Sequence, residues 1–353
     1  MASPCVGLDI GSSSIKAVSI EPGRRGARLT RFGIEYLQPQ VIVDGALMDQ
    51  ATVVEAIGRL KAALGIGNRD VAIAISGHSV IVKKIQMAPM SREAIAERIP
   101  AEAEQHIPFK RDEVDIDYQI VSPKGAPGPL EIILVAAKKD MIADYLQVIR
   151  DAKLRPAVVD VAAFSVQNAF EAAYGDVAKT GVVALVHVGN ALTHINVVNS
   201  GVSVFVRDVT VGGEAFTEEI QRRLHVSHEE AEHLKLTSGD PAAAAAAPAA
   251  LATVMKEVAE GTATKVQRSI DFFLASSSDL KLSRIYLSGG TAGVAALAQQ
   301  FEQRGKVPVE ILDPFRKALV DETKLDPAFV KRHAAEAAVA FGLALRRPGD
   351  SDA

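Results

Sequence analysis

Apolar residues along the first 78 positions recur with the spacing of a mixed α/β sheet. Short apolar runs and two-residue alternation predict strands at Val6–Ile10, Ser14–Glu21, Arg28–Leu37 and Asp70–Ser76. Before the last of these strands, apolar positions three and four residues apart predict a helix over Thr52–Leu64. Three strands, a helix and a further strand are typical of one half of a mixed α/β fold.

A different block follows position 78. Its pattern is strand, helix, two strands and helix, at Ser79–Met87, Ser91–His106, Val114–Val121, Leu130–Ala137 and Lys139–Lys153. Pro100 interrupts the first helical stretch, and because proline suits the first position of a helix, we expect a second short helix over Pro100–Ile107. A strand at Ala157–Val161 then resumes the first pattern. Residues 79–156 are therefore predicted to form an inserted α/β subdomain.

The opening strand pattern occurs a second time in the middle of the chain. The segment VGLDIGSSSIKAVSIEPG aligns with ALVHVGNALTHINVVNSG, so that Gly11 matches Gly189 and Gly23 matches Gly201 at the same offset. A helix at Ala163–Tyr174 precedes the second copy. Because chance rarely reproduces both order and spacing, the repeat predicts two similar lobes.

The rest of the chain is predicted to be helical at first and then α/β again. Residues Glu214–Ser278 have a helical pattern, but the Ala-rich stretch Pro241–Ala252 has prolines on both sides and no periodicity, which favours a loop. Later elements are predicted at Arg284–Ser288, Gly293–Arg304, Val307–Leu312 and Ala334–Leu345. The predicted division is 1–78, 157–181 and 334–345 for the first lobe, 79–156 for the insertion, 182–213 and 279–333 for the second lobe, 214–278 for a helical subdomain, and 346–353 for a disordered tail.

Composition excludes several classes of protein. The net charge of −4 provides no basic excess for binding a nucleic-acid backbone. The single cysteine, Cys5, forms neither an internal disulfide nor a zinc site by itself, which fits a reducing compartment. The N-terminus lacks the features of a signal peptide, and no apolar run approaches the roughly 20 residues of a membrane span. We therefore expect a cytoplasmic protein.

Glycine turns carry the candidate chemistry. The first strand ends in Asp9-Ile10-Gly11-Ser12-Ser13-Ser14 and its counterpart in His187-Val188-Gly189-Asn190, and a third turn, Ser288-Gly289-Gly290-Thr291, stands between a strand and a helix. Glycine and small hydroxyl residues let backbone N–H groups approach an anion, Asp9 suits a hydrated Mg²⁺, and Lys16 adds a positive charge. Each turn alone is more typical of a plain hairpin than of a binding site. Neither the P-loop nor the dinucleotide-binding glycine motif is present.

Taken together, these motifs resemble those of the actin, sugar kinase and Hsp70 superfamily. Within it, the stretches GLDIGSSSIKAV, ERIPAEAEQHIPFKRDEVDIDYQIV, RPAVVDVAAFSVQNAF, VGGEAFTEEIQRRL and YLSGGTAGVAAL resemble the PilM family, the actin-like cytoplasmic proteins of type IV pilus assembly. The segment Ile99–Phe109 is the most family-specific. The resemblance implies an α/β fold of two actin-like (RNase H-like) lobes, an inserted α/β subdomain called 1C and a mainly helical 2B-like subdomain.

The resemblance also implies that ATP and Mg²⁺ bind between the lobes. The residues that it implies are Gly11, Ser12, Ser13, Ser14 and Lys16 at the first phosphate motif with Asp9 near the metal, Gly189, Asn190 and Thr193 at the second, and Gly212, Gly213, Thr217, Glu218, Gly289, Gly290 and Thr291 near the nucleoside. Lys235, from the stretch EEAEHLK, is added to the nucleoside set, with a solvated lysine on an acidic helix as the alternative.

Binding partners follow from the same resemblance. Members of the family capture the cytoplasmic N-terminal peptide of PilN in a groove between subdomains 1A and 1C. The resemblance further implies contacts with other pilus machinery subunits, including the motor ATPase, self-association in a ring, and a peripheral position at the inner membrane without insertion. Twitching motility is the process in which such a machine acts.

One position departs from the family pattern. The second phosphate motif normally begins with Asp, whereas this chain has His187. Since a neutral imidazole brings no fixed negative charge to metal-bound water, we expect ATP hydrolysis to be slow or absent. The alternative is that His187 only fills a strand end of a degenerate cleft. Two other functions stay open: a small-molecule kinase of the same superfamily, and the cytoplasmic actin-like domain of a type II secretion system.

Overall fold

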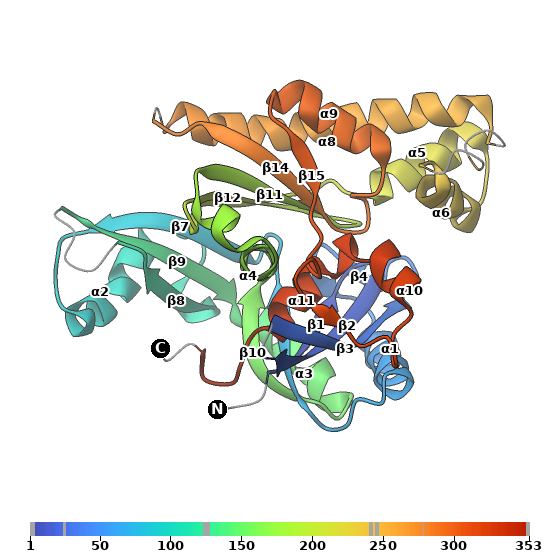
Figure 1. The fold of residues 1–353 in the computed structure, drawn as a ribbon. Coiled ribbons are helices and arrows are strands. Elements are labelled where there is room, and N and C mark those ends of the chain that lie inside the picture. The colour runs from blue at the N-terminus through green and yellow to red at the C-terminus, as the bar shows by residue number, and fades with distance from the viewer. Residues whose placement is uncertain are drawn as a thin grey trace.

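The computed structural model describes residues 4–23, 26–122, 128–239, 243, 247–277 and 279–350. Two lobes pack against each other, each built on its own sheet, and a smaller subdomain projects from the first lobe (Figure 1). The long helix α8 (Ala249–Ala275) runs along the outer side of the second lobe (Figure 1). No helix in the described ranges is long and apolar enough to cross a membrane.

The two sheets repeat one topology. In the first lobe the strand order is β10 (Arg155–Val161), β6 (Asp70–Ile75), β1 (Val6–Ile10), β2 (Ser14–Gly23), β3 (Gly26–Tyr36) and β16 (Leu319–Val320). In the second lobe it is β15 (Val309–Ile311), β14 (Leu282–Ser288), β11 (Val182–Val188), β12 (Thr193–Asn199) and β13 (Val202–Val209). The first strand of each lobe pairs antiparallel with the next strand and parallel with a later one. The duplication and the mixed α/β class predicted from the sequence are confirmed.

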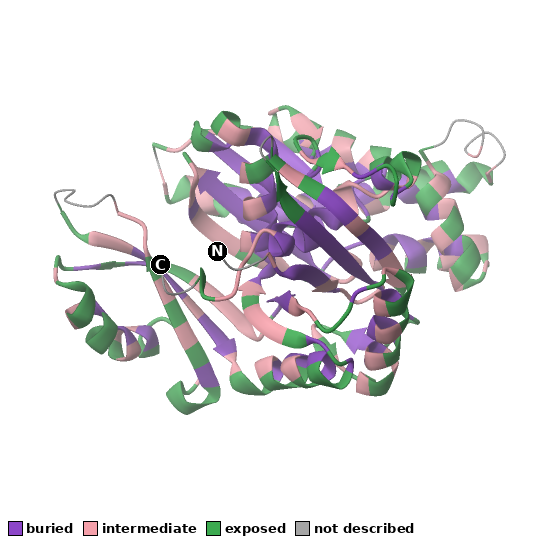
Figure 2. Ribbon diagram, turned by 60° about the horizontal axis from the view of Figure 1, so that its bottom comes forward, coloured by how far each residue is buried: buried purple, intermediate pink, exposed green. Residues whose placement is uncertain are grey.

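Two helices join the lobes. The helices α4 (Ala162–Tyr174) and α11 (Ala338–Ala344) pack closely together, and one cluster of buried side chains contains Val166 and Phe170 of α4 with Leu185 and Tyr286 of the second sheet. The rest of the second core lies under α8, α5 (Glu214–Leu224) and α9 (Ala295–Gly305). Figure 2 shows the buried residues concentrated in these central sheets and helices.

The inserted subdomain has a small core of its own. Its sheet has the order β7 (Val80–Met87), β9 (Leu130–Lys138) and β8 (Val114–Ile120), and the helix α2 (Arg92–Glu104) buries Ile95, Ile99 and Ala103 against this sheet. In Figure 2 it stands apart from the two lobes and carries many exposed positions. The predicted boundary at residue 156 is too late, because α3 (Lys139–Asp151) packs with α1 (Gln50–Ala63) in the core of the first lobe.

Three further predictions differ from the structure. Pro100 lies inside α2 and starts no second helix, because the stripe Ile95, Ile99 and Ala103 is buried only if one helix continues past it. Phe315 and β16 already belong to the first lobe, so the second lobe ends before residue 333. The predicted loop Pro241–Ala252 overlaps α8, which begins at Ala249, and residues 241–242 and 244–246 of it lie outside the described residues.

The predicted disordered tail is wrong for residues 346–350. The carbonyl of Arg346 accepts a hydrogen bond from the N–H of Cys5 at 2.9 Å, and its guanidinium lies 3.6 Å from Asp160. The shorter elements of the structure are β4 (Ile42–Val43), β5 (Ala46–Leu47), α6 (His228–Thr237), α10 (Pro327–Arg332) and the 3-10 turns Arg111–Glu113, Gly175–Lys179 and Ala335–Ala337. The predicted final helix is thus a 3-10 turn followed by α11.

Candidate nucleotide cleft

The two duplicated glycine turns line one cleft between the lobes. The first lobe contributes Asp9, Ile10, Gly11, Ser12, Ser13 and Lys16 to its walls, and the second contributes His187, Gly189, Asn190, Ala191, Leu192 and His194. Both turns follow the first strand of their lobe, β1 and β11. The duplication therefore brings equivalent turns together from residues far apart in the sequence.

Each turn closes on itself and leaves backbone donors available. The N–H of Gly11 donates to the carbonyl of Ser14 at 3.1 Å, and the N–H of Gly189 donates to that of Leu192 at 2.9 Å. Within the described part of the chain, the N–H groups of Ser12, Ser13, Asn190 and Ala191 make no hydrogen bond. Backbone N–H groups in a concave turn are the donors that phosphate groups use in proteins, so the turns fit an anion.

An ion pair stands at the first turn. Asp9 on β1 and Lys16 on β2 are direct neighbours across the strands, and Lys16 Nζ lies 3.4 Å from Asp9 Oδ2. Both side chains are largely buried, with 15% and 11% of their surface exposed. One carboxylate beside a lysine suits Mg²⁺, which takes few protein ligands and shares the rest of its shell between water and phosphate oxygens. Asp9 would hold the metal, and Lys16 would face the phosphates.

A histidine occupies the equivalent place in the second turn. His187 Nδ1 lies 3.0 Å from the hydroxyl of Ser288, and the His187 ring stacks on His194 with 5.7 Å between ring centroids. Burial holds the pKa of His187 well below its usual value, and the positive charges of His194 and Lys16 act in the same direction. The second phosphate motif therefore carries a neutral imidazole where a carboxylate would bring negative charge.

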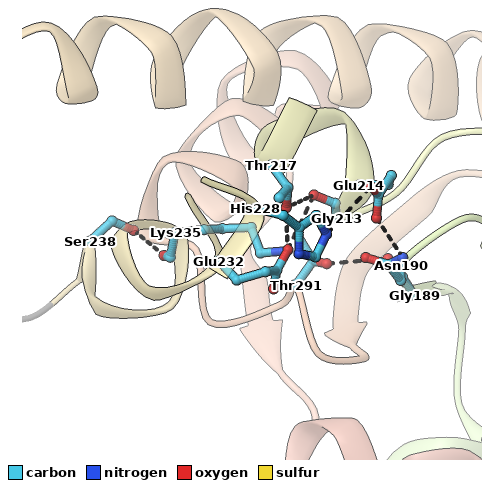
Figure 3. A network of polar contacts seen from close by, with 10 residues as sticks. All are labelled: Gly189, Asn190, Gly213, Glu214, Thr217, His228, Glu232, Lys235, Ser238 and Thr291. Atoms are coloured by element: carbon cyan, nitrogen blue, oxygen red, sulfur yellow. Dashed lines mark hydrogen bonds and ion pairs between the residues drawn. The ribbon is translucent and has the colours of Figure 1, made fainter. Parts of the chain in front are cut away.

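A polar network around a buried lysine adjoins the cleft at Asn190 (Figure 3). Lys235 on α6 is 4% exposed, and its ammonium contacts the carbonyl of Gly213, the hydroxyl of Thr217 and Glu232 Oε1 at 3.3, 3.0 and 2.5 Å. The amide of Asn190 donates to Glu214 Oε2 at 2.8 Å. Polar groups from the second phosphate turn, α5 and α6 thus converge, and the alternative of a solvated lysine is wrong.

Three glycines let backbone segments cross at this point. A Cβ on Gly212 would lie 2.4 Å from the carbonyl oxygen of Asn190, and one on Gly213 would lie 2.5 Å from Thr291 Oγ1. Gly289 has φ +94°, and a Cβ there would lie 2.3 Å from the carbonyl of Val188. Larger residues would push these segments apart, so the close approach of the second and third turns depends on glycine.

Comparison with known proteins follows this geometry. A family model described as type IV pilus assembly protein PilM matches residues 7–348. This chain belongs to the PilM family. A solved structure of the PilM–PilN type IV pilus biogenesis complex is similar to it, with 26% identity, a TM-score of 0.86, and coverage of 98% of this chain and 99% of the other.

Two more distant structures share the fold of this PilM-family chain. The ethanolamine utilization protein EutJ from Carboxydothermus hydrogenoformans is 17% identical, with a TM-score of 0.58 over 98% of this chain and 92% of the other. MreB5 of Spiroplasma citri bound to AMPPNP is 12% identical, with a TM-score of 0.54 over 97% and 95%. The actin-like fold predicted from the sequence is thus confirmed.

Some of the expected site residues have other contacts. Thr193 is fully buried, and its hydroxyl donates to the carbonyl of Val211 at 2.7 Å, so it supports the turn from behind. Ser14 is buried at the start of β2 and contributes its carbonyl to the turn. Glu218 lies exposed on α5, outside the network of Figure 3. Gly290 lies in the third turn, where a Cβ would be 3.5 Å from Glu336 Oε2.

The sequence reading missed two carboxylates of the network. Glu214 directly follows Gly213 at the start of α5. Glu232 precedes Lys235 by three residues, so that Glu232 and Lys235 share one face of α6. That spacing is a signal that could have identified Glu232. It also missed His194 and Asp208, whose contact at 2.7 Å depends on the pairing of β12 with β13.

Proposed function

We propose that this chain is a nucleotide-binding adaptor of the type IV pilus machine that captures the cytoplasmic N-terminal segment of PilN. The PilM family match over residues 7–348 supports the role in pilus assembly, and the similarity to a PilM–PilN complex supports PilN as the partner. PilN binding would hold the adaptor at the cytoplasmic face of the inner membrane. Ring formation and contact with the motor ATPase belong to the same proposal.

ATP is the ligand that the cleft fits best. The free N–H groups of the two turns would hold the phosphates, with Asp9 beside Mg²⁺ and Lys16 beside the phosphate oxygens. Glu232 and Lys235 would face the nucleoside. Among the described residues that line the cleft, Asp9 is the only carboxylate, and Lys16 already pairs with it. A small-molecule kinase needs a further carboxylate base at the substrate hydroxyl, so this arrangement favours binding over group transfer.

Hydrolysis would be slow because His187 is neutral. Loss of one preorganised electrostatic contribution in an active site costs about a hundred- to a thousandfold in rate. Steady-state phosphate release should therefore be close to the buffer background in the wild type and should rise in His187→Asp. His187→Asn, which keeps a polar neutral side chain, is the matched control and should stay slow. Wild-type turnover comparable to that of an efficient ATPase would refute the assignment.

The side of the first lobe nearest the inserted subdomain is the proposed PilN surface. β10 is the outer strand of the first sheet, so one of its edges has no strand partner in the described sheet (Figure 1). Val159 on this strand leaves 36% of its surface exposed. An extended peptide gains main-chain hydrogen bonds by adding to such an edge.

Titration of a fluorescent peptide with the PilN N-terminal sequence tests this proposal. We expect saturable binding by fluorescence polarisation and no binding of a scrambled peptide. Val159→Asp should weaken binding about tenfold or more, because it places a charge on the contacted edge. Val177→Asp, at a valine that is 51% exposed away from this strand, is the matched control and should bind normally. Absence of saturable binding with and without ATP would remove PilN as the partner.

A further inference from the structure

Four polar side chains form a row across the second sheet. Ser288, His187, His194 and Asp208 are direct neighbours on β14, β11, β12 and β13. His187 contacts Ser288 at 3.0 Å and stacks on His194, and His194 Nδ1 lies 2.7 Å from Asp208 Oδ1. The row therefore runs without interruption from the third glycine turn, past the second phosphate turn, to the edge of the sheet.

This row ends on the other lobe. The N–H of Gly77 donates to Asp208 Oδ2 at 2.6 Å. Gly77 lies between the end of β6 and the start of β7, the first strand of the inserted subdomain, and its carbonyl accepts from the N–H of Val80 at 3.0 Å. The preceding residue, Ser76, lines the nucleotide cleft. Asp208 thus fixes the position of Gly77 in the joint, by which we mean the connection between β6 of the first lobe and β7 of the inserted subdomain.

Gly77 is fixed from more than one side. Its φ of +87° is a conformation that other residues rarely adopt, and a Cβ would lie 3.4 Å from Leu192 of the second phosphate turn and 3.3 Å from the carbonyl of Asp44. The joint is therefore in close contact with both the turn and the row. A movement of the second lobe relative to the first has to change the surroundings of Gly77.

His194 and Asp208, at the end of the row, each stabilise the charged form of the other. Burial by itself lowers the pKa of His194, but the charge and hydrogen bond of Asp208 outweigh it and raise the pKa above the usual value. Burial by itself raises the pKa of Asp208, and His194 with the N–H of Gly77 outweighs it and lowers the pKa. The other charged or titratable groups that act on the row are Asp9, Lys16, His187 and His78. A buried ion pair is by itself weak evidence for stability, and removal of one partner leaves the other charge buried and unpaired.

We infer that His194 and Asp208 are positioning residues that connect the phosphate end of the cleft to the base of the inserted subdomain. Occupation of the cleft shifts the second phosphate turn, the row transmits the shift to Gly77, and the inserted subdomain changes its orientation on the first lobe. The connection itself is a property of the ligand-free fold. The response of this connection to a bound nucleotide rests on the proposed function, so the ligand-free connection and the nucleotide response are tested separately.

Hydrogen exchange measured by mass spectrometry on the full chain tests the connection without any ligand. We expect Asp208→Ala to speed amide exchange in a fragment covering residues 77–87 by about tenfold or more, because a hydrogen bond to a charged acceptor is lost. Asp208→Asn, which keeps an oxygen acceptor, should show a smaller increase. Asp70→Asn is the matched control, because Asp70 starts β6 and pairs with Arg155 at 2.8 Å, away from the row. Unchanged exchange in folded Asp208→Ala would overturn the inference.

The second arm adds ATP and Mg²⁺. In the wild type, exchange in residues 77–87 should change on addition, and in Asp208→Asn this response should be lost while ATP affinity, measured by calorimetry, stays within about threefold. A merely structural role would leave the response in place. If ATP does not bind the wild type, the proposed function fails and the ligand-free result still decides the connection. If Asp208→Ala does not fold, Asp208→Asn and His194→Gln decide, and exchange like that of the wild type in both refutes the inference.

Discussion

The contact between α4 and α11 predicts a large effect of one methyl group. Gly342 on α11 crosses α4 so closely that a Cβ would lie 1.8 Å from the carbonyl oxygen of Ser165 and 2.6 Å from its carbonyl carbon. An ordinary contact begins at 3.4 Å, so Gly342→Ala requires the two helices to separate by roughly 1.5 Å. Neither backbone can give way as a flexible side chain would.

Separation of these helices affects both lobes. Ala338 and Leu343 of α11 belong to the cluster that joins the lobes, and Ala340 and Phe341 belong to a cluster of the first lobe. Overpacking of a rigid core costs about 3 kcal/mol, from which the better helix propensity of alanine removes up to about 1 kcal/mol. A net loss of about 2 to 3 kcal/mol corresponds to a fall in the unfolding temperature of roughly 3 to 4 °C in a chain of this size.

The assay is thermal unfolding with a matched alanine variant. Gly261 lies inside the long helix α8, and a Cβ there meets nothing within 4 Å. Gly261→Ala should therefore stabilise the protein by up to about 1 kcal/mol through helix propensity alone. Equal unfolding temperatures of Gly342→Ala and Gly261→Ala would refute the reasoning, because they would mean that α4 and α11 do not pack at the described distance.

Three further expectations concern charged groups. Burial raises the pKa of Asp160, although the charge of Arg346 opposes this shift. Ionisation of Asp160 therefore lowers the stability of the folded protein as pH rises above about 4. Asp160→Asn should raise the unfolding temperature more at pH 7 than at pH 4. Because the pKa of His194 is raised in the folded state, the stability that its charged form contributes is complete below about pH 6.5 and is lost as pH rises through the folded-state pKa. His194→Gln should therefore make the free energy of unfolding depend less on pH on the alkaline side. Lys16→Met should weaken ATP binding about tenfold or more in calorimetry, because it removes a positive charge from the phosphate end, whereas exposed Lys179→Met should not.

The sequence was sufficient for the architecture because the architecture is repeated. Gly11 and Gly189 occur in the same order of strands, and two-residue alternation marks the strands on either side, so local patterns determined which elements pair. Where local pattern and tertiary packing disagreed, packing prevailed. Pro100 is a helix breaker by its own chemistry, yet α2 continues through it because three apolar side chains are buried only in one helix.

The site was predictable to the extent that it is local. Glycine turns and their flanking residues could be read from the sequence, whereas Glu218, which the resemblance implies near the nucleoside, is exposed on α5. The contact of Asp208 with Gly77 joins residues 131 positions apart, in different lobes. No local pattern encodes such a contact, because it depends on how the second sheet is placed against the first lobe.

His187 links the two proposals, because one substitution tests both. A carboxylate at this position would lie beside the ring of His194 and compete with Asp208 for the imidazole. Weaker pairing of His194 with Asp208 would loosen the hydrogen bond to Gly77. His187→Asp should therefore gain hydrolysis and, in the same sample, exchange faster in residues 77–87, whereas neutral His187→Asn should change neither. A gain in hydrolysis with unchanged exchange would separate the chemistry of the cleft from the row, and would leave the imidazole with the single effect of keeping the turn uncharged.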